Sequence, residues 1–145
     1  MDKPVMITLT ATAISDEEMP DTIQLLTSGT LTELEDGYML AYEESLDETE
    51  PPQHVELRLT QRGVTMSRTG AYATDMVFRR GERFECLYNT PQGTLELALY
   101  CTKSVFNVGD EGGAVQLKYQ LDMGGQYVAM HDLNLRFAFK KETVA

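Results

Sequence analysis

One stretch of the sequence combines an apolar alternation with a charge. In VTMSRTG, Val64 and Met66 alternate with Thr65 and Ser67, which is the two-residue period of a half-buried strand. The same alternation places Arg68 on the apolar face. A buried guanidinium needs a carboxylate or other hydrogen-bond acceptors, because an unpaired buried charge is costly. Its planar fork also suits carboxylate and phosphate ligands, so Arg68 is the first candidate for chemistry in this chain.

Several other polar residues also continue the apolar phase of a predicted strand. In YMLAYEE, for example, the phase of Leu40 runs on to Tyr42 and Glu44. The candidate ligand-binding residues collected in this way are Arg68, Glu44, Tyr42, Tyr88, Tyr119 and His131, and Lys103 is assigned to the same inner face. Polar groups that face a core are informative, because they are stable there only with partners.

A tight turn predicts what lies beside the glutamate. Turning over Asp36-Gly37 would place Tyr42 opposite Leu31 and Glu44 opposite Gly29. The missing side chain of Gly29 would then leave room for the carboxylate.

A second turn, over Arg62-Gly63, would place Arg68 opposite Leu57. The longer loop before it would pair Leu57 with Tyr42. Arg68 and Tyr42 would then lie on either side of Leu57 across three neighbouring strands, and Glu44 would lie diagonally from Arg68. We therefore predict an Arg68–Glu44 ion pair, with tyrosine hydroxyls as further partners. Three roles stay open: a plug that closes the barrel end, an anion anchor in a ligand cavity, or an arginine that reaches solvent.

Residues for other chemistry are not arranged in a catalytic or metal-binding pattern. The sequence has neither a phosphate-binding P-loop nor a dinucleotide fingerprint. His54 and His131 are isolated from each other and from the cysteines, so no metal-ligand spacing is formed. Glu43 and Glu44 point to opposite faces and are not an acid–base pair. We expect no enzymatic activity, no metal and no cofactor.

The two cysteines are expected to be free thiols. YNTPQGTL predicts a hairpin in which Asn89 faces Thr94, and Cys86 then lies opposite Leu97. Cys101 lies four residues further along, about 13 Å away at the rise of a strand, whereas a disulfide needs Cα atoms within about 7 Å. Both thiols are predicted to be buried.

Strands must position these side chains, because no long segment shows a convincing helical period. Segments such as HVELRLT alternate, and glycine-containing turns recur about every 8–12 residues, which is typical of a β-sandwich or barrel. The mostly short links favour an up-and-down meander barrel of about 8–10 antiparallel strands, because closure removes exposed edges. One domain over residues 1–145 is expected, with acidic loops at Ser15–Asp21 and Ser45–Gln53.

Net charge narrows the class of partner. The chain carries a formal net charge of −11, and its 12 lysines and arginines are scattered. A nucleic-acid surface needs clustered basic residues, and an anionic membrane also repels an acidic protein. No stretch approaches the roughly 18 apolar residues of a membrane helix, and the beginning of the sequence lacks a signal-peptide pattern. We expect a cytoplasmic protein, either a monomer or a homodimer.

The stretches TSGTL, YMLAYEE, MSRTG, LYNTPQGTLELALYCT and LKYQLDMGG resemble, in this order, the YwiB-like family of small bacterial proteins. The resemblance runs nearly from end to end. It implies a calycin-type β-barrel, similar in build to lipocalins, and no reaction, because the family has no known function. The residues that match its pattern are Gly29, Tyr42, Glu44, Arg68, Gly70, Tyr88, Thr90, Gly93, Thr102 and Tyr119.

Two classes of function follow as expectations. The first is a barrel that binds a small apolar or amphipathic molecule, with an acidic head near Arg68. The second is a structural or protein-interaction module whose barrel is filled by its own side chains. An enzyme that uses Tyr, Glu44 and His131 is a third and weaker hypothesis.

Overall fold

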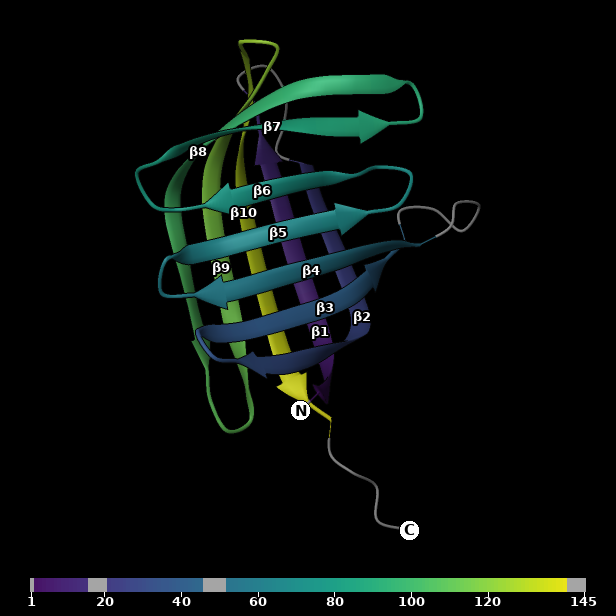
Figure 1. Cartoon of the computed structure of the whole chain (residues 1–145), viewed down its shortest axis with the longest axis vertical. Coiled ribbons are helices and arrows are strands. Elements are labelled where there is room, and N and C mark those ends of the chain that lie inside the picture. The colour runs from purple at the N-terminus through teal and green to yellow at the C-terminus, as the bar shows by residue number, and fades with distance from the viewer. Residues whose placement is uncertain (1, 16–20, 46–51, 141–145) are drawn as a thin grey trace.

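Ten antiparallel strands make up the regular secondary structure of the described residues (Figure 1). The structure is a computed structural model that describes residues 2–15, 21–45 and 52–140. The strands are β1 (Asp2–Ile14), β2 (Asp21–Leu34), β3 (Gly37–Glu44), β4 (Gln53–Thr60), β5 (Gly63–Thr69), β6 (Thr74–Phe78), β7 (Arg83–Thr90), β8 (Gly93–Val108), β9 (Gly112–Met123) and β10 (Gln126–Phe139). Most residues of the two predicted acidic loops, 16–20 and 46–51, lie outside the described residues.

The strands form one sheet that curls into a barrel. Their order is β6-β5-β4-β3-β2-β1-β10-β9-β8-β7, so chain neighbours pair throughout, except β6 with β7, and β1 pairs with β10. The two edges, β6 and β7, meet through a bridge in which Ala73 and Asn89 exchange two backbone hydrogen bonds of 2.9 Å. The predicted up-and-down barrel is confirmed as a nearly closed one, and it is consistent with a calycin-like fold.

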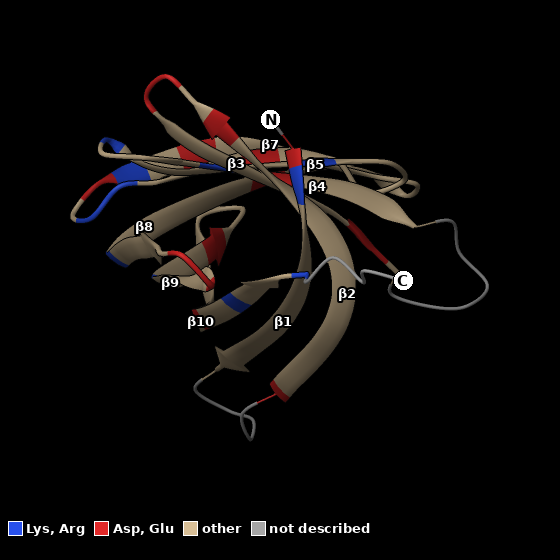
Figure 2. Cartoon of the chain, turned by 90° about the horizontal axis from the view of Figure 1, so that it is seen from below, with Lys and Arg blue, Asp and Glu red and all other residues tan. Residues whose placement is uncertain are grey.

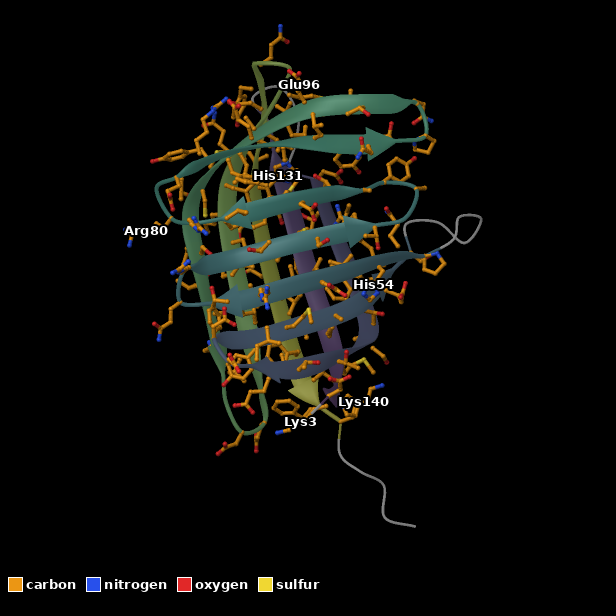
Figure 3. The ribbon with its side chains drawn as sticks, in the orientation of Figure 1. Lys3, His54, Arg80, Glu96, His131 and Lys140 are labelled. Carbon is orange, nitrogen blue, oxygen red and sulfur yellow. The ribbon has the colours of Figure 1, made fainter. Side chains whose placement is uncertain are left out.

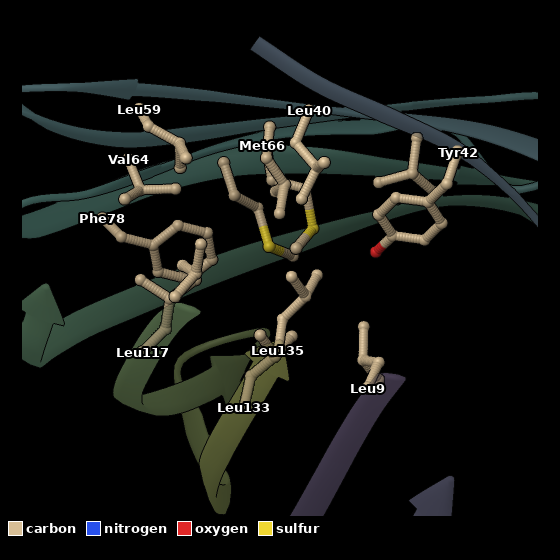
Figure 4. Packing of buried hydrophobic residues seen from close by; sticks show 14 of the residues in the cluster. Leu9, Leu40, Tyr42, Leu59, Val64, Met66, Phe78, Leu117, Leu133 and Leu135 are labelled. Atoms are coloured by element: carbon tan, nitrogen blue, oxygen red, sulfur yellow. The ribbon is translucent and has the colours of Figure 1, made fainter. Parts of the chain in front are cut away.

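The core fills the space between two walls of this barrel. Seen from its end, β3, β4, β5 and β7 lie on one side and β1, β8, β9 and β10 on the other (Figure 2). Alternation in the sequence creates the inner surface: in β4, Val55, Leu57 and Leu59 are buried and Arg58 is exposed. Figure 4 shows side chains of the two walls pointing toward one another across the interior.

Two of the three predicted hairpin registers, β2–β3 and β4–β5, are wrong by two residues. The turn between β4 and β5 runs over Gln61-Arg62, and Thr60 lies opposite Gly63. Gly63 therefore begins the next strand, with a φ of 137°, where a Cβ atom would lie only 2.7 Å from the carbonyl oxygen of Phe78. The glycine serves the close approach of β6 and not the turn. The turn between β2 and β3 is displaced in the same way.

The shifted register gives a different role to the glycine of β2. Tyr42 lies opposite Gly29, not Leu31, and Glu44 lies beyond the paired part of β2. A Cβ atom on Gly29 would overlap the neighbouring backbone, and it would lie 2.7 Å from Cδ1 of Ile7 and 3.2 Å from Cβ of Tyr42. Gly29 thus makes room for Ile7 and Tyr42, and not for Glu44 as predicted.

A bulge in β8 corrects the predicted orientation of Lys103. The register shifts between Cys101 and Lys103, so Lys103 lies opposite Lys118. Lys118 alternates with the inner-face residues Leu117 and Tyr119, and Lys103 therefore belongs to the outer face. A strictly alternating prediction cannot anticipate the extra residue of a bulge.

No helix long and apolar enough to cross a bilayer occurs within the described part of the chain.

Candidate functional site

An ion pair between β3 and β5 is the centre of the candidate site. Arg68 lies opposite Val55, not Leu57 as predicted, and Val55 lies opposite Tyr42. Arg68 and Tyr42 therefore lie on either side of the same β4 residue, as predicted, but this residue is Val55 and not Leu57. Nη2 of Arg68 lies 3.1 Å from Oε2 of Glu44, and the two side chains are 20% and 15% exposed. The predicted Arg68–Glu44 ion pair is confirmed.

This pair leaves hydrogen-bonding groups unused. Oε2 of Glu44 and Nε of Arg68 are buried, and neither has a hydrogen-bond partner among the described residues. The 3.1 Å contact satisfies the distance of an ion pair without the alignment of a hydrogen bond. The predicted hydrogen bonds, in which the guanidinium group donates to tyrosine hydroxyls, are not formed among the described residues, so this part of the prediction is wrong. A buried polar group without a partner costs about 1–3 kcal/mol, so the described residues leave this site unsatisfied.

Three tyrosines surround the ion pair. Burial raises the pKa of Tyr119 to about 12, and the positive charge of Arg68 opposes this rise. The pKa of Tyr42 is also raised, first by burial and then by the charge of Glu44, and the charge of Arg68 again opposes the rise. Burial raises the pKa of Tyr88, with the same opposing effect of Arg68. One guanidinium therefore acts on all three rings, and all three phenols are neutral at pH 7.

His131 joins this cluster through an aromatic stack. Its ring lies parallel to the ring of Tyr119, with centroids 5.1 Å apart, and Phe78 packs on the same tyrosine at 4.8 Å. Burial lowers the pKa of His131, and its Nε2 atom is buried without a hydrogen-bond partner within the described ranges. Figure 3 labels His131 far from Lys3 and Lys140, which lie at the opposite end of the barrel.

Apolar side chains on the inner face are exposed beside this cluster. Leu95 lies opposite Tyr88 and is 41% exposed, and Met123 lies opposite the buried Leu97 and is 37% exposed. Ile23, in the part of β2 that has no β3 partner, is 55% exposed. Residues opposite each other in an antiparallel pair point to the same side, so these apolar side chains line the open end of the barrel.

Two site residues were missed by the sequence reasoning. Gln53 is 4% exposed, lies opposite Glu44, and accepts a hydrogen bond of 3.0 Å from the backbone N–H of Tyr72. Thr74 is 5% exposed, lies opposite Arg68, and donates to the carbonyl oxygen of Leu87. Gln53 could have been found, because it continues the apolar phase of β4 backwards. Thr74 carried the same signal, because it continues the apolar phase of Met76 and Phe78 backwards in the short strand β6.

The two thiols border this cluster, because Thr74 donates to Sγ of Cys86 at 3.9 Å and Cys101 lies opposite Tyr119. Cys86 and Cys101 are free, as predicted; Cys101 is buried and Cys86 is half-buried. A hollow of about 630 Å³ lies at the turns after β2 and β4 and contacts Phe106, and four further hollows are smaller or shallower. Arg68 and Glu44 line none of these five hollows. The candidate site is therefore identified from the polar and apolar side chains that meet there, and not from a surface hollow.

The other histidine binds carboxylates on the outer surface. Nδ1 of His54 lies 3.1 Å from Glu43 and Nε2 lies 3.0 Å from Glu56, and these hydrogen bonds raise the pKa of His54. Among the described residues, no group of three or more His, Cys, Asp or Glu side chains is placed to hold a metal ion.

The fold and the inner ion pair define a ten-stranded up-and-down barrel protein with a polar cluster at one end. Residues 7–135 match the family described as "Domain of unknown function (DUF1934)", and the chain belongs to this family. Its structure is similar to the crystal structure of the YwiB protein from Bacillus subtilis, with a TM-score of 0.84 and 17% identity over 97% of this chain and 94% of that chain. The YwiB-like resemblance seen in the sequence is confirmed. No curated protein matches the sequence.

Proposed function

We propose that this protein binds a small amphipathic molecule at the open end of its barrel and does not act as an enzyme. The observation that supports this function best is the partly exposed Arg68–Glu44 pair with unused hydrogen-bonding groups. A polar head placed there would supply the partners that the described residues do not provide. Such sites commonly combine an apolar lining with a few polar groups that fix the orientation of the ligand.

The exposed inner-face side chains would receive the apolar part of the molecule. Ile23, Leu95 and Met123 lie on strands that converge on the same end as the polar cluster. Covering their exposed apolar surface would stabilise a complex by roughly 25 cal/mol per Å². Tyr88, which lies opposite Leu95 and is affected by the charge of Arg68, connects the two parts of the site.

The alternative function is a structural or protein-interaction module with a filled barrel. The observation that favours it is the dense packing elsewhere in the barrel, where Ile7, Leu40, Leu57 and Leu135 are fully buried. In that case the Arg68–Glu44 pair would only close the end of the barrel. The two free thiols support a location in the reducing cytoplasm, and either function is compatible with a monomer or a homodimer.

Fluorescence of the neutral dye N-phenyl-1-naphthylamine tests ligand binding, because the chain has no tryptophan to interfere. We expect dye emission to rise with protein concentration and to saturate. The substitution Ile23→Asp should weaken binding by about tenfold or more, because it places a charge on the apolar inner face.

The matched control is Leu26→Asp, which adds the same charge to the same strand on its outer face. Leu26 is 69% exposed and should not affect the dye. A wild-type protein that does not enhance dye emission, or two variants that lose binding equally, would favour the filled-barrel alternative.

A further inference from the structure

We propose that the polar head of the bound molecule is uncharged and carries both a hydrogen-bond donor and an acceptor, as a primary amide or an alcohol does. This inference rests on the proposed function and specifies the class of ligand. It replaces the acidic head that Arg68 alone suggests in the sequence. Two independent features of the site support it, its charge balance and its unused hydrogen-bonding groups.

The charges of the site already cancel. Arg68 contributes one positive charge and Glu44 one negative charge, with 3.1 Å between Nη2 and Oε2. His131 adds no charge at pH 7, because burial lowers its pKa. A carboxylate head would meet the charge of Glu44, and an ammonium head would meet that of Arg68. Like charges repel strongly where side chains are mostly buried, so a neutral head is favoured over either ion.

Within the Arg68–Glu44 pair, the buried groups without a partner are one acceptor and one donor. Oε2 of Glu44 can accept a hydrogen bond, and Nε of Arg68 can donate one. A primary amide or an alcohol can donate to the first and accept from the second. A carboxylate has only acceptors and would leave Glu44 without a partner. Both side chains are partly exposed, so a head group can approach the pair from the open end, and a small shift of the two side chains would bring it to the buried Oε2 and Nε atoms.

Competition among three ligands with the same ten-carbon chain tests the head group directly. Decanamide, decanoate and decylamine would each displace N-phenyl-1-naphthylamine from the wild-type protein at pH 7.5, below their micelle concentrations. We expect decanamide to displace the dye at concentrations about tenfold lower than either ion. Displacement by decanoate at equal or lower concentrations would overturn the inference without any variant.

The substitution Glu44→Gln tests the cause of this preference. It leaves Arg68 as the only charge of the pair, so decanoate should gain about tenfold relative to decanamide. Glu43→Gln is the matched control, because it removes the same charge from the adjacent residue on the outer face. The control should keep the wild-type order of the three ligands. An unchanged order in Glu44→Gln would overturn the inference.

The two proposals fail in different ways. If the dye does not bind, the proposed function fails before any head group is compared. If the dye binds and is displaced by decanoate as readily as by decanamide, ligand binding is supported and the neutral head is wrong. Melting temperatures of both glutamine variants establish whether each is folded. If Glu44→Gln does not fold, the ranking of the three ligands on the wild-type protein still tests the neutral head group.

Discussion

At the scale of single residues, the position of Arg68 is explained by a partner far away in sequence. The guanidinium continues an apolar phase because Glu44, two strands away, provides a carboxylate at 3.1 Å. Neither side chain is fully buried, and the contact lacks the alignment of a hydrogen bond. The pair therefore resembles an incompletely satisfied site more than a tight structural ion pair.

The two histidines should make opposite contributions to the pH dependence of stability. The pKa of His54 is raised by its hydrogen bonds to Glu56 and Glu43, so the folded protein holds the proton more tightly. This stabilisation is complete below the unfolded pKa of about 6.5 and is lost as the pH rises through the folded pKa. The side chain of His54 is 42% exposed, so the contribution is at most about 1 kcal/mol.

His131 should show the reverse slope in the same experiment. Burial lowers its pKa, so the unfolded chain binds a proton at a pH where the folded protein does not, and stability falls as the pH falls below about 6.5. Urea unfolding between pH 5.5 and 8 checks both signs. The stability lost in His54→Gln should be larger at pH 5.5, and the stability lost in His131→Gln larger at pH 8. Curves parallel to the wild type would contradict both assignments.

At the scale of elements, sequence alternation predicted the strands and the composition of the inner face. The β7–β8 register was correct, with Cys86 opposite Leu97, because its turn residues lie between the strands as expected. Two other hairpins were displaced because Gly37 and Gly63 begin strands. The outward orientation of Lys103 depends on a bulge, which alternation cannot reveal. The ion pair was still predicted correctly, because each register error displaced the pairing by two residues and so preserved the faces.

The close approach at Gly29 gives a prediction about strand packing. Gly29→Ala should destabilise the protein by about 1–3 kcal/mol, because the new Cβ atom would push against the backbone of β3 and against Ile7. Gly109→Ala is the control, since the nearest atom to its Cβ position is the carbonyl oxygen of Gly112 at 3.7 Å. Its effect should stay within about 0.5 kcal/mol. Equal urea midpoints for the two variants would show that β2 and β3 can separate without cost.

At the scale of the whole molecule, the barrel has one weak seam. Every other pair of neighbouring strands is joined by an extended ladder, with one register shift each in β8–β9 and β9–β10, whereas β6 and β7 share the Ala73–Asn89 bridge and the side-chain hydrogen bond from Thr74 to Leu87. Thr74 lies opposite Arg68, so the seam borders the candidate site. Local opening requires the least free energy where few hydrogen bonds must break, so this seam should open before the β9–β10 side of the barrel.

Hydrogen exchange after Thr74→Val measures this local opening. Valine keeps the shape of threonine and removes its 3.0 Å hydrogen bond to the carbonyl oxygen of Leu87, which is worth about 1 kcal/mol. The amides of Ala73 and Asn89 should therefore exchange about fivefold faster, with β10 unchanged. Thr65→Val is the control, because no described residue hydrogen-bonds its hydroxyl group. If β10 accelerates as much as the bridge amides, the barrel opens as one unit. If the bridge amides do not accelerate, the threonine contact does not hold the seam.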